Sequence, residues 1–468
     1  MENSQTDVVE PSGSAAYDVG VIGLGYVGLT LATALADSGL RVVGIERRQD
    51  IVDLTNSGKP HFHEVGLEYM LQSVLKRGLI QARTELDPDI TCKVYIITVG
   101  TPLGSDGSAR LDFMRNAVAE VASNMQDGAL VMLRSTVKIG TTREVVLPIL
   151  SATEKTFQLA MCPERTLEGK AMEELQRLPQ IIGADQVDAR EAAARFFSRL
   201  TPTVVQFPRY ETAEIIKLVD NTYRDVQFAF ANEVARACEP FGVNAMDVIE
   251  GGKLGYPRTN LAIPGLVGGP CLEKDPHIFR ESVSRYGIEL EITKAARHVN
   301  EQQPFETVKA ACEIFKARTG RLPNSVGLFG VAFKGVPETN DLRGTMAALV
   351  HRAVLEQAPN AKINIYDPAT LREEVENMFS NVEVFDTHAQ ALDGIDLLFI
   401  TNNNPIFGKL RIDEVLGFMG PDALIYDYWN HFSRIRAEDR GDRYFSVGGL
   451  EAAHSLLFSQ ASNEAVTP

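Results

Sequence analysis

The chain has 468 residues, enough for roughly two to four domains, so a peptide hormone or a disulfide-stabilised miniprotein is excluded. Its 46 Lys and Arg residues and 62 Asp and Glu residues give a formal net charge of −16, which repels phosphate backbones, so we expect no nucleic-acid partner. With 44% hydrophobic and 23% charged residues, the composition is that of a folded globular protein rather than a disordered chain.

The two ends of the chain differ in composition from the rest. Residues 1–16 and residues 459–468 are polar and without periodicity, and we predict that both are disordered tails. No segment approaches the roughly 20 apolar residues that cross a bilayer, and the N-terminus carries no signal pattern. We therefore expect a cytoplasmic protein with no membrane partner.

From residue 17 onward the chain alternates between strand and helix patterns. A strand at Asp18–Ile22, a helix at Val27–Asp37 and a strand at Arg41–Ile45 form a predicted βαβ unit. Further predicted elements are strands at Val94–Val99, Leu130–Leu133 and Gln158–Met161 and a helix at Leu111–Asn124. The alternation predicts an α/β domain with a parallel sheet over residues 17–205.

One long helix is expected next, because Glu211–Glu239 has helical periodicity and no Gly or Pro. It opens a central helical region at residues 206–318, and a second α/β domain is expected at residues 319–458. The strand-like runs of that domain are Ser325–Phe329, Lys362–Tyr366, Asp396–Thr401 and Ala423–Asp427. The predicted fold is two Rossmann-like, doubly wound α/β domains joined by a long central helix.

The first turn has the pattern of a dinucleotide-binding site, with glycines at 23, 25 and 28 between a strand and a helix. Gly23 permits the tight turn, Gly25 lets a pyrophosphate approach the backbone, and Gly28 allows the helix to pack closely on the strand. The helix N-terminus offers unpaired N–H groups to the anion. The alternative, that these glycines only shape a turn, is disfavoured by the strand, the helix and an acidic residue in register.

That acidic residue is Glu46, which ends the next strand eighteen residues beyond Gly28. A carboxylate in this position accepts hydrogen bonds from the ribose hydroxyls of NAD. The following Arg47 and Arg48 can bind the 2′-phosphate of NADP, so NADP stays an alternative to the preferred NAD.

The cysteines show no zinc or redox pattern, because they are far apart and include no C-x-x-C pair. We expect no metal site and five free thiols, one of them reactive. The five are Cys92, Cys162, Cys238, Cys271 and Cys312.

Cys271 lies in the segment 264–276, which is too rich in Gly and Pro for a regular element. Lys274 supplies a cation that favours the thiolate, and Asp275 supplies a carboxylate that can carry a proton. Alone, such a cysteine is more often incidental. Beside a nicotinamide, a thiolate can trap an aldehyde as a thiohemiacetal that a second hydride transfer turns into a thioester.

The long helix carries Glu214, Lys217 and Asn221 on one face, at positions i, i+3 and i+7. A Lys and an Asn on one face can stabilise an oxyanion, a contribution worth roughly 3 to 4 kcal/mol per donor in acyl-transfer sites. A solvated helix face is the competing interpretation of the same spacing.

These motifs resemble the UDP-glucose/GDP-mannose dehydrogenase family, whose members use NAD to oxidise a nucleotide sugar twice at C6. The resemblance runs from Val19 to about Gly448. Its pieces are residues 21–28, Gly100-Thr101-Pro102, Ser135-Thr136-Val137, Pro163-Glu164-Arg165, Ala213-Glu214 with Lys217 and Asn221, Gly268-Gly269-Pro270-Cys271, Phe333-Lys334 and Asp341-Leu342-Arg343.

The resemblance implies a set of catalytic residues. Cys271 would be the nucleophile, Lys217 and Asn221 would stabilise the oxyanion, and Asp275 and Glu164 would handle protons during thioester hydrolysis. Thr136 would order a water molecule near the nicotinamide.

It also implies binding residues. Thr101, Thr136 and Arg343 would touch the cofactor, together with the turn residues Gly23, Gly25, Tyr26, Val27, Gly28 and Glu46. The nucleotide sugar would be held by Arg165, Thr166, Lys217, Asn221, Arg258, Gly268, Phe333 and Lys334, with the UDP part on the second α/β domain. A homodimer would form through the long helix.

Residues 162–170 and Asp275-Pro276 are more similar to the branch of the family that acts on UDP-N-acetylhexosamines, so UDP-N-acetylmannosamine or UDP-N-acetylglucosamine is the preferred substrate, oxidised for surface polysaccharide. Pro270 and Glu273 depart from the family pattern, and Glu273 places a negative charge two residues from the thiol. UDP-glucose or GDP-mannose is an alternative substrate. A regulator without catalysis and a two-electron dehydrogenase with an idle Cys271 are alternative functions.

Overall fold

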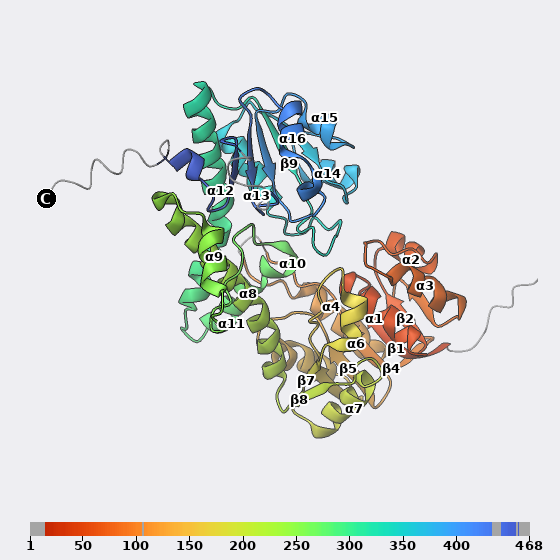
Figure 1. Ribbon diagram of the computed structural model, residues 1–468. Helices are drawn as coiled ribbons and strands as arrows, with labels where there is room; N and C mark the ends of the chain where they lie inside the picture. Colours follow the sequence, from red (N-terminus) through yellow and green to blue (C-terminus); the bar gives the residue numbers. More distant parts are fainter. Residues whose placement is uncertain (1–14, 105–106, 433–440, 455–456, 458–468) are drawn as a thin grey trace, which may run out of the picture. The chain divides into compact units, whose positions relative to one another are not determined.

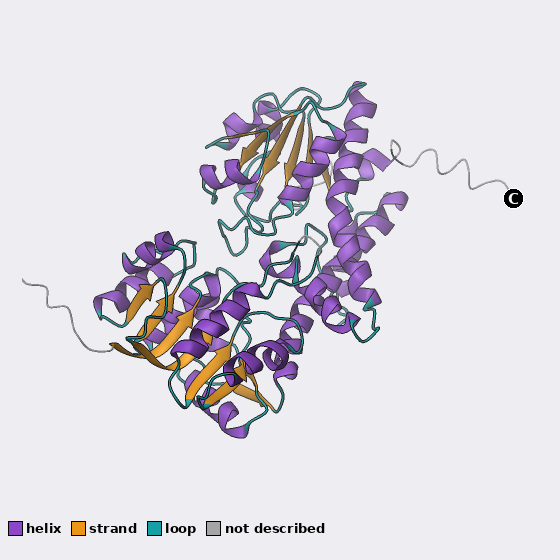
Figure 2. Cartoon of the chain, turned by 180° about the vertical axis from the view of Figure 1, so that it is seen from behind, coloured by secondary structure: helices purple, strands orange, loops and turns teal. Residues whose placement is uncertain are grey.

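The structure is a computed structural model that describes residues 15–104, 107–432, 441–454 and 457. The chain forms two compact units, of which the first ends at Lys217 and the second begins at Leu218. Figure 1 colours the elements in sequence order from red to blue, and in Figure 2 helices flank the sheet of each unit. Each unit contains a mostly parallel sheet, so the predicted fold class is confirmed.

The first unit is built on an eight-stranded sheet with the order β3-β2-β1-β4-β5-β6-β7-β8. Every strand pairing is parallel except the short antiparallel contact of β6 with β7. The strands are β1 (Ala15–Ile22), β2 (Val42–Ile45), β3 (Ile80–Arg83), β4 (Ile90–Ile97), β5 (Ala129–Leu133), β6 (Phe157–Met161), β7 (Gln180–Gly183) and β8 (Val204–Phe207).

The strand order of the first sheet reverses between β1 and β4, and this reversal locates its binding edge. Ile22 at the end of β1 pairs with Ile45 of β2 on one side and with Ile97 of β4 on the other. The three strands thus end side by side. Ligands of open α/β sheets bind outside the carboxyl ends of the strands at such a reversal.

Helices cover both faces of this sheet and bury its apolar strands (Figure 2). Strands with both faces covered read as continuous apolar runs, as β2 and β5 do. The helices are α1 (Tyr26–Asp37), α2 (Gln49–Asn56), α3 (Leu67–Lys76), α4 (Asp112–Asn124), η1 (Thr142–Val146), α5 (Leu147–Ser151), α6 (Ala171–Arg177) and α7 (Val187–Phe197).

The predicted long helix is α8 (Tyr210–Cys238), which starts in the first unit and ends in the second. Helices α9 (Ala245–Lys253), α10 (Gly269–Leu272), α11 (Asp275–Ser284) and α12 (Glu291–Thr319) follow it. Helix α12 is as long as α8 and continues through the buried Pro304. Ala229 of α8 packs with Ala296 and Val299 of α12 in a small apolar cluster.

The second unit contains a six-stranded, all-parallel sheet with the order β11-β10-β9-β12-β13-β14. Apolar clusters lie against it, the larger including residues of α8 and α12. The strands are β9 (Ser325–Phe329), β10 (Lys362–Tyr366), β11 (Val382–Val384), β12 (Leu397–Ile400), β13 (Leu424–Asp427) and β14 (Tyr444–Ser446). The helices are α13 (Ala347–Gln357), α14 (Arg372–Met378), α15 (His388–Leu392), η3 (Phe407–Lys409), α16 (Ile412–Phe418) and η4 (Glu451–Ala453).

The predicted N-terminal tail is too long by two residues. Ala15 and Ala16 belong to β1, where they lie opposite Ile90 and Thr91 of β4, because backbone pairing extends past the apolar run that marks the strand in the sequence. The rest of that tail and the predicted tail at 459–468 lie outside the described residues. Within the described ranges, no helix is long and apolar enough to cross a membrane.

Candidate active site

The glycine turn lies at the carboxyl end of β1 and leads directly into α1. Gly23 has a φ of +96°, a conformation that favours glycine. A Cβ on Gly28 would lie 1.8 Å from the carbonyl oxygen of Gly23, so only glycine fits there. A Cβ on Gly25 would meet no described atom within 4 Å, which leaves open space beside the N-terminus of α1. This turn fits the pyrophosphate of a dinucleotide.

Glu46 is held at the edge of the same turn. Its Oε2 accepts a hydrogen bond of 3.1 Å from the backbone N–H of Leu24, and its Oε1 accepts one of 3.2 Å from that of Arg48. The guanidinium of Arg48 is engaged elsewhere, because its Nε donates to Asp50 at 3.2 Å. A fixed carboxylate and a neutralised arginine favour the ribose hydroxyls of NAD over the phosphate of NADP.

Thr101 and Thr136, both predicted to contact the cofactor, are hydrogen-bonded to each other beyond the ends of β4 and β5. The hydroxyl of Thr101 donates to the carbonyl oxygen of Thr136 at 2.5 Å, and that of Ser135 donates to the carbonyl oxygen of Val99 at 2.6 Å. Thr101 is buried, whereas Thr136 keeps part of its surface exposed. Both threonines therefore lie at the carboxyl edge of the sheet, where the fold places its ligands.

Glu164 is buried in the loop at residues 162–170, and hydrogen bonds saturate its carboxylate. Its Oε2 accepts bonds of 2.9 and 2.6 Å from Arg134, and its Oε1 accepts bonds of 2.7 and 2.8 Å from the backbone N–H groups of Arg165 and Thr166. Burial opposes ionisation of Glu164, but Arg134 and these amides hold its pKa below the usual value. The carboxylate is thus ionised and fixes the backbone of the predicted sugar-binding residues.

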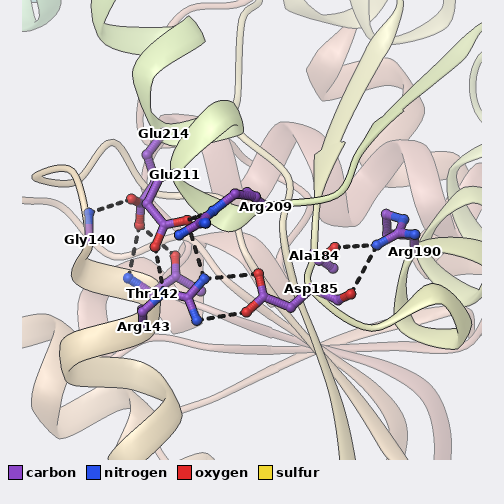
Figure 3. Close-up of polar contacts among 9 residues, drawn as sticks. All are labelled: Gly140, Thr142, Arg143, Ala184, Asp185, Arg190, Arg209, Glu211 and Glu214. Carbon is purple, nitrogen blue, oxygen red and sulfur yellow. Dashed lines mark hydrogen bonds and ion pairs between the residues drawn. The ribbon is translucent and has the colours of Figure 1, made fainter.

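Partly exposed ion pairs and buried amide contacts attach the start of α8 to the rest of the first unit (Figure 3). Glu214 accepts hydrogen bonds from the backbone N–H groups of Gly140 and Thr142, at 2.6 and 2.9 Å. Arg143 bridges Glu211 and Asp185, and Arg143 lowers the pKa of Glu211 to about 2. These contacts fix the helix that carries Lys217.

The polar face of α8 is buried rather than solvated. Glu214, Lys217 and Asn221 are 1%, 8% and 7% exposed. The competing interpretation of a solvated face is therefore wrong, because the spacing alone does not tell which surface covers the face.

Cys271 does not lie in an irregular loop, as its Gly- and Pro-rich surroundings predicted. It is the third residue of the one-turn helix α10. Pro270 is tolerated as the second residue because backbone N–H groups in the first turn of a helix have no intrahelical acceptor. Cys271 is exposed and the other four cysteines are buried. Burial raises the pKa of Cys92, Cys162 and Cys312 to about 12 and also raises that of Cys238. Cys271 is thus the accessible thiol among the five.

Asp275, one turn beyond Cys271, is fully buried, and each of its carboxylate oxygens accepts a hydrogen bond. Its Oδ2 accepts a hydrogen bond of 2.6 Å from the side-chain amide of Asn221, and its Oδ1 accepts one of 3.2 Å from Nζ of Lys274. Two predicted catalytic residues, far apart in the sequence, are thus in direct contact.

Arg297 of α12 holds the backbone on both sides of Cys271. Its Nη1 donates to the carbonyl oxygen of Leu272 at 2.8 Å, and its Nη2 donates to that of Val267 at 2.9 Å. Its charge is balanced by Asp225, whose Oδ1 lies 2.7 Å from Nη1. Arg297 is 2% exposed and was not predicted from the sequence.

Glu273 stands two residues from Cys271, and its side chain is exposed. The atoms crowded around its carboxyl raise its pKa by desolvation, while Arg297 opposes that rise.

The cysteine helix contacts the loops that follow β9 in the same unit. The N–H of Gly269 donates to the carbonyl oxygen of Gly344 at 2.7 Å, and a Cβ on Gly269 would lie 2.5 Å from the ring of Phe333. Gly268 is equally constrained, because its Cβ would lie 2.5 Å from the same carbonyl oxygen. There is thus no room for a side chain at either of the two positions before Pro270, and both are glycine.

The charged residues near these loops make defined local contacts. Arg343 donates from Nε to both carboxylate oxygens of Asp341, at 3.0 and 2.9 Å. Nζ of Lys334 lies 5.0 Å from the ring centroid of Phe333. Arg258 is exposed and stacks on Tyr256, 4.6 Å from its ring centroid, outside these contacts.

The predicted site residues fall into two groups. The first unit holds Gly23, Gly25, Tyr26, Val27, Gly28, Glu46, Thr101, Thr136, Glu164, Arg165, Thr166 and Lys217, and the second holds Asn221, Arg258, Gly268, Cys271, Asp275, Phe333, Lys334 and Arg343. A cavity of about 480 Å³ between α11 and α12 is lined by His277, Arg280, Glu291, Lys294, Ala295, Arg297, His298 and Glu301, none of which was predicted.

The chain matches all three domains of one protein family. Residues 17–201 match the NAD binding domain of the UDP-glucose/GDP-mannose dehydrogenase family, residues 211–302 its central domain, and residues 327–434 its UDP binding domain. These segments contain the glycine turn, the cysteine helix and most of the second sheet, without β14.

Individual relatives agree with this match. The chain is 31% identical to a UDP-N-acetyl-D-mannosamine dehydrogenase of Campylobacter jejuni over 85% of this chain and 98% of that protein. It is 29% identical to an NDP-N-acetyl-D-galactosaminuronic acid dehydrogenase of Ralstonia nicotianae, over 85% and 93%. The solved UDP-D-ManNAc dehydrogenase of Pyrococcus horikoshii superposes with a TM-score of 0.80 at 28% identity, covering 93% of this chain and 100% of that one.

The glycine turn, the open space at Gly25 and the fixed carboxylate of Glu46 fit NAD, the cofactor of the matched first domain. The chain belongs to the UDP-glucose/GDP-mannose dehydrogenase family and is an NAD-dependent nucleotide-sugar dehydrogenase.

Proposed function

We propose that this protein oxidises C6 of a UDP-N-acetylhexosamine, with N-acetylmannosamine or N-acetylglucosamine as the sugar, from alcohol to carboxylate. One sugar, two NAD⁺ and one water would give one uronate, two NADH and three protons. The observation that carries this proposal is Cys271, an exposed thiol on a helix whose backbone Arg297 fixes on both sides.

When bound, NAD⁺ would supply the hydride acceptor for two oxidations, first of the alcohol and then of the thiohemiacetal. The Cys271 sulfur adds to the C6 aldehyde to form that thiohemiacetal, and loss of the second hydride leaves a thioester. Water then attacks the thioester carbon, the C–S bond breaks, and the thiol is restored.

Lys217 and Asn221 would stabilise the negative oxygen that forms at C6 when sulfur or water adds. Both are buried, so their charge and dipole act in a medium that screens weakly. Asp275 would orient Asn221 and accept a proton from the attacking water. Glu164 would act mainly by holding the loop at 162–170, since its carboxylate already accepts four hydrogen bonds.

The cofactor group of residues comprises the turn at 23–28, Glu46, Thr101 and Thr136, with Arg343 as a further contact. Arg165, Thr166, Arg258, Gly268, Phe333 and Lys334 would hold the nucleotide sugar. The match of residues 327–434 to a UDP binding domain supports UDP as the nucleotide. The names of the relatives support an N-acetylated sugar, and the uronate would enter surface polysaccharide.

A homodimer through α8 belongs to the same proposal. Val219, Tyr223 and Phe230 on this helix are 42%, 61% and 53% exposed, an apolar surface that a second copy would cover. Light scattering should give twice the chain mass for the native protein and a lower mass for Tyr223→Asp.

The experiment that tests the function counts NADH per sugar consumed, at completion, for UDP-N-acetylmannosamine, UDP-N-acetylglucosamine, UDP-glucose, UDP-galactose and GDP-mannose. Two NADH with an N-acetylhexosamine is the expected result. Two with UDP-glucose or GDP-mannose would assign the alternative substrate, and one NADH would leave Cys271 idle. No NADH with any of the five would favour a regulator.

A further inference from the structure

Glu64 is a buried carboxylate that joins two parts of the first unit and belongs to none of the predicted motifs. It lies between α2 and α3 and is 5% exposed. Its Oε2 accepts a hydrogen bond from the hydroxyl of Tyr26 and one of 2.6 Å from the backbone N–H of Gly169. Its Oε1 accepts one of 2.9 Å from the N–H of Ala171.

The two parts that Glu64 joins have different tasks. Tyr26 is the first residue of α1 and belongs to the glycine turn of the cofactor site. Gly169 lies next to the last residue of the loop at 162–170, which carries Arg165 and Thr166. Its N–H also donates to the Tyr26 hydroxyl at 3.0 Å. Tyr26, Glu64 and Gly169 thus form a closed triangle of hydrogen bonds.

Three carboxylates hold backbone N–H groups of this loop and its end. Glu164 holds those of Arg165 and Thr166, and Glu174 holds that of Leu167 at 2.6 Å. Glu64 holds those of Gly169 and Ala171 and is the one of the three that bonds to Tyr26. A change at Tyr26 therefore reaches Gly169 both directly and through Glu64, and it reaches Ala171 through Glu64.

The Tyr26 end of this link is a hydrogen-bond donor at all ordinary pH values. Burial, and then the hydrogen bond to Glu64, raise the pKa of Tyr26 well above its usual value, so the phenol stays protonated. A buried carboxylate that loses such a donor is left with an unsatisfied oxygen, which is unfavourable. The hydrogen bonds among Tyr26, Glu64 and Gly169 therefore form or break together.

We propose that Glu64 is a positioning residue through which cofactor binding at the glycine turn orders the sugar-binding loop at residues 162–170. A dinucleotide against the N-terminus of α1 would restrict Tyr26, and the triangle would pass that restriction to Gly169 and Ala171. The assignment of the loop to the sugar rests on the proposed function. By linkage, the factor by which the cofactor strengthens sugar binding is also the factor by which the sugar would strengthen cofactor binding.

The test is hydrogen exchange of the peptide spanning residues 162–172, with and without saturating NAD, followed by mass spectrometry. In the native protein NAD should slow exchange of this peptide by about fivefold or more, the lower end of usual coupling. Glu64→Gln keeps the side-chain size, but its Nε2 only donates, so it cannot accept both from Tyr26 and Gly169 at the Oε2 position and from Ala171 at the Oε1 position. Tyr26→Phe removes the hydroxyl and keeps the ring against Phe62, at a centroid distance of 4.8 Å. Both variants should lose the NAD-dependent slowing.

Glu174→Gln is the matched control, because Glu174 holds the same loop and does not bond to Tyr26. It should speed exchange in both states and keep the NAD-dependent slowing. The dissociation constant of NAD is measured for every variant so that each is saturated. NAD-dependent slowing that persists in Glu64→Gln, or that is absent from the native protein, would overturn the proposal, as would its loss in Glu174→Gln.

This readout needs no sugar, so its failure is distinct from a failure of the proposed function. Once a substrate is known, Glu64→Gln should raise KM for the sugar by about fivefold or more at saturating NAD, with a smaller change in kcat. Glu64→Asp, which keeps the charge and shortens the reach, should recover part of the effect.

Discussion

The side-chain amide of Asn221 donates a hydrogen bond of 2.6 Å to Oδ2 of Asp275. Asn221 is 7% exposed and Asp275 is 0% exposed, so the bond lies out of water and fixes which end of the amide faces the carboxylate. Asn221 comes from the long helix and Asp275 from the segment that carries Cys271. The contact thus joins the two elements that would surround a negative oxygen on C6.

Asp275→Asn should slow the hydrolysis of the thioester more than its formation. An amide in place of the carboxylate keeps the size but cannot accept a proton from water, and loss of a general base typically costs about 10²- to 10⁴-fold. Rapid mixing should show a burst of two NADH per site followed by slow turnover, with the acylated protein visible by mass spectrometry. A slowed first hydride transfer without a burst would contradict this role.

Cys271 should be the site of selective alkylation. Iodoacetamide under native conditions should label this exposed thiol and leave the four buried ones, whose raised pKa values keep them protonated. Cys271→Ser should abolish uronate formation while the dissociation constant of NAD stays within about twofold. Cys312→Ser, at a buried thiol, is the control and should remain active. Near-normal turnover of Cys271→Ser would remove the thioester mechanism.

Lys217→Ala should lower kcat by roughly two to three orders of magnitude if this buried side chain is the proposed donor to the oxyanion. Lys316→Ala, at an exposed position of α12, is the control and should change kcat little. Both are measured by NADH absorbance under saturating conditions. A loss below threefold for Lys217→Ala would restrict this lysine to a structural role.

Glu46→Ala should relax the preference for NAD. Loss of a hydrogen bond to a charged group costs about 1.5 to 3 kcal/mol, so kcat/KM with NAD should fall by about 10- to 100-fold while that with NADP changes little. Asp50→Ala, which frees the Arg48 guanidinium, should raise NADP use without lowering NAD use. An unchanged ratio of NAD to NADP in Glu46→Ala would argue against the ribose contact.

Glu239 should make stability depend on pH. Burial raises the pKa of this carboxyl to about 7, although a backbone hydrogen bond from Gly448 and the charge of Arg236 oppose the rise. The unfolded chain ionises near the usual value of 4.5, so between pH 4.5 and 7 it releases a proton that the folded chain keeps. The free energy of unfolding should therefore fall as pH rises through this window.

Urea unfolding of Glu239→Gln should lack this fall and should show a higher midpoint than the native protein at pH 8. Glu211→Gln provides a comparison of opposite sign, since Arg143 lowers the pKa of Glu211 to about 2. Relative to the native protein, Glu211→Gln should be destabilised most above pH 4.5, and this difference should disappear as the pH falls toward 2. If the free energy of unfolding of Glu239→Gln changed with pH in parallel with that of the native protein, the raised pKa of Glu239 would be contradicted.

The sequence was informative where a pattern is local. Periodicity predicted α8 within one residue at each end, and apolar runs predicted β9 and β10 without error. The short strands β7 and β8 were not predicted, since a glutamine in each shortens its apolar run. Helix α12 was also missed, because Pro304 inside it reads as a helix breaker.

The side chains that hold the site together were mostly invisible in the sequence. Arg297 is 72 residues from Asp225, and Glu64 is 105 residues from Gly169, so no spacing rule connects them. The position of Arg134 in the sequence gives a partial indication of its role. It follows the apolar run of β5 directly, and an arginine in such a position must find a partner when buried, but nothing in the sequence identifies that partner as Glu164.

The contrast between one exposed and four buried cysteines also sets how this protein responds to peroxide. Oxidation would begin as a sulfenic acid on Cys271 and leave the interior thiols reduced, so a reductant should restore the native chain after brief exposure. The same contrast allows the folded protein to be attached to a thiol-reactive surface through a single bond of known position. A nucleotide sugar that occupies the site should block that attachment.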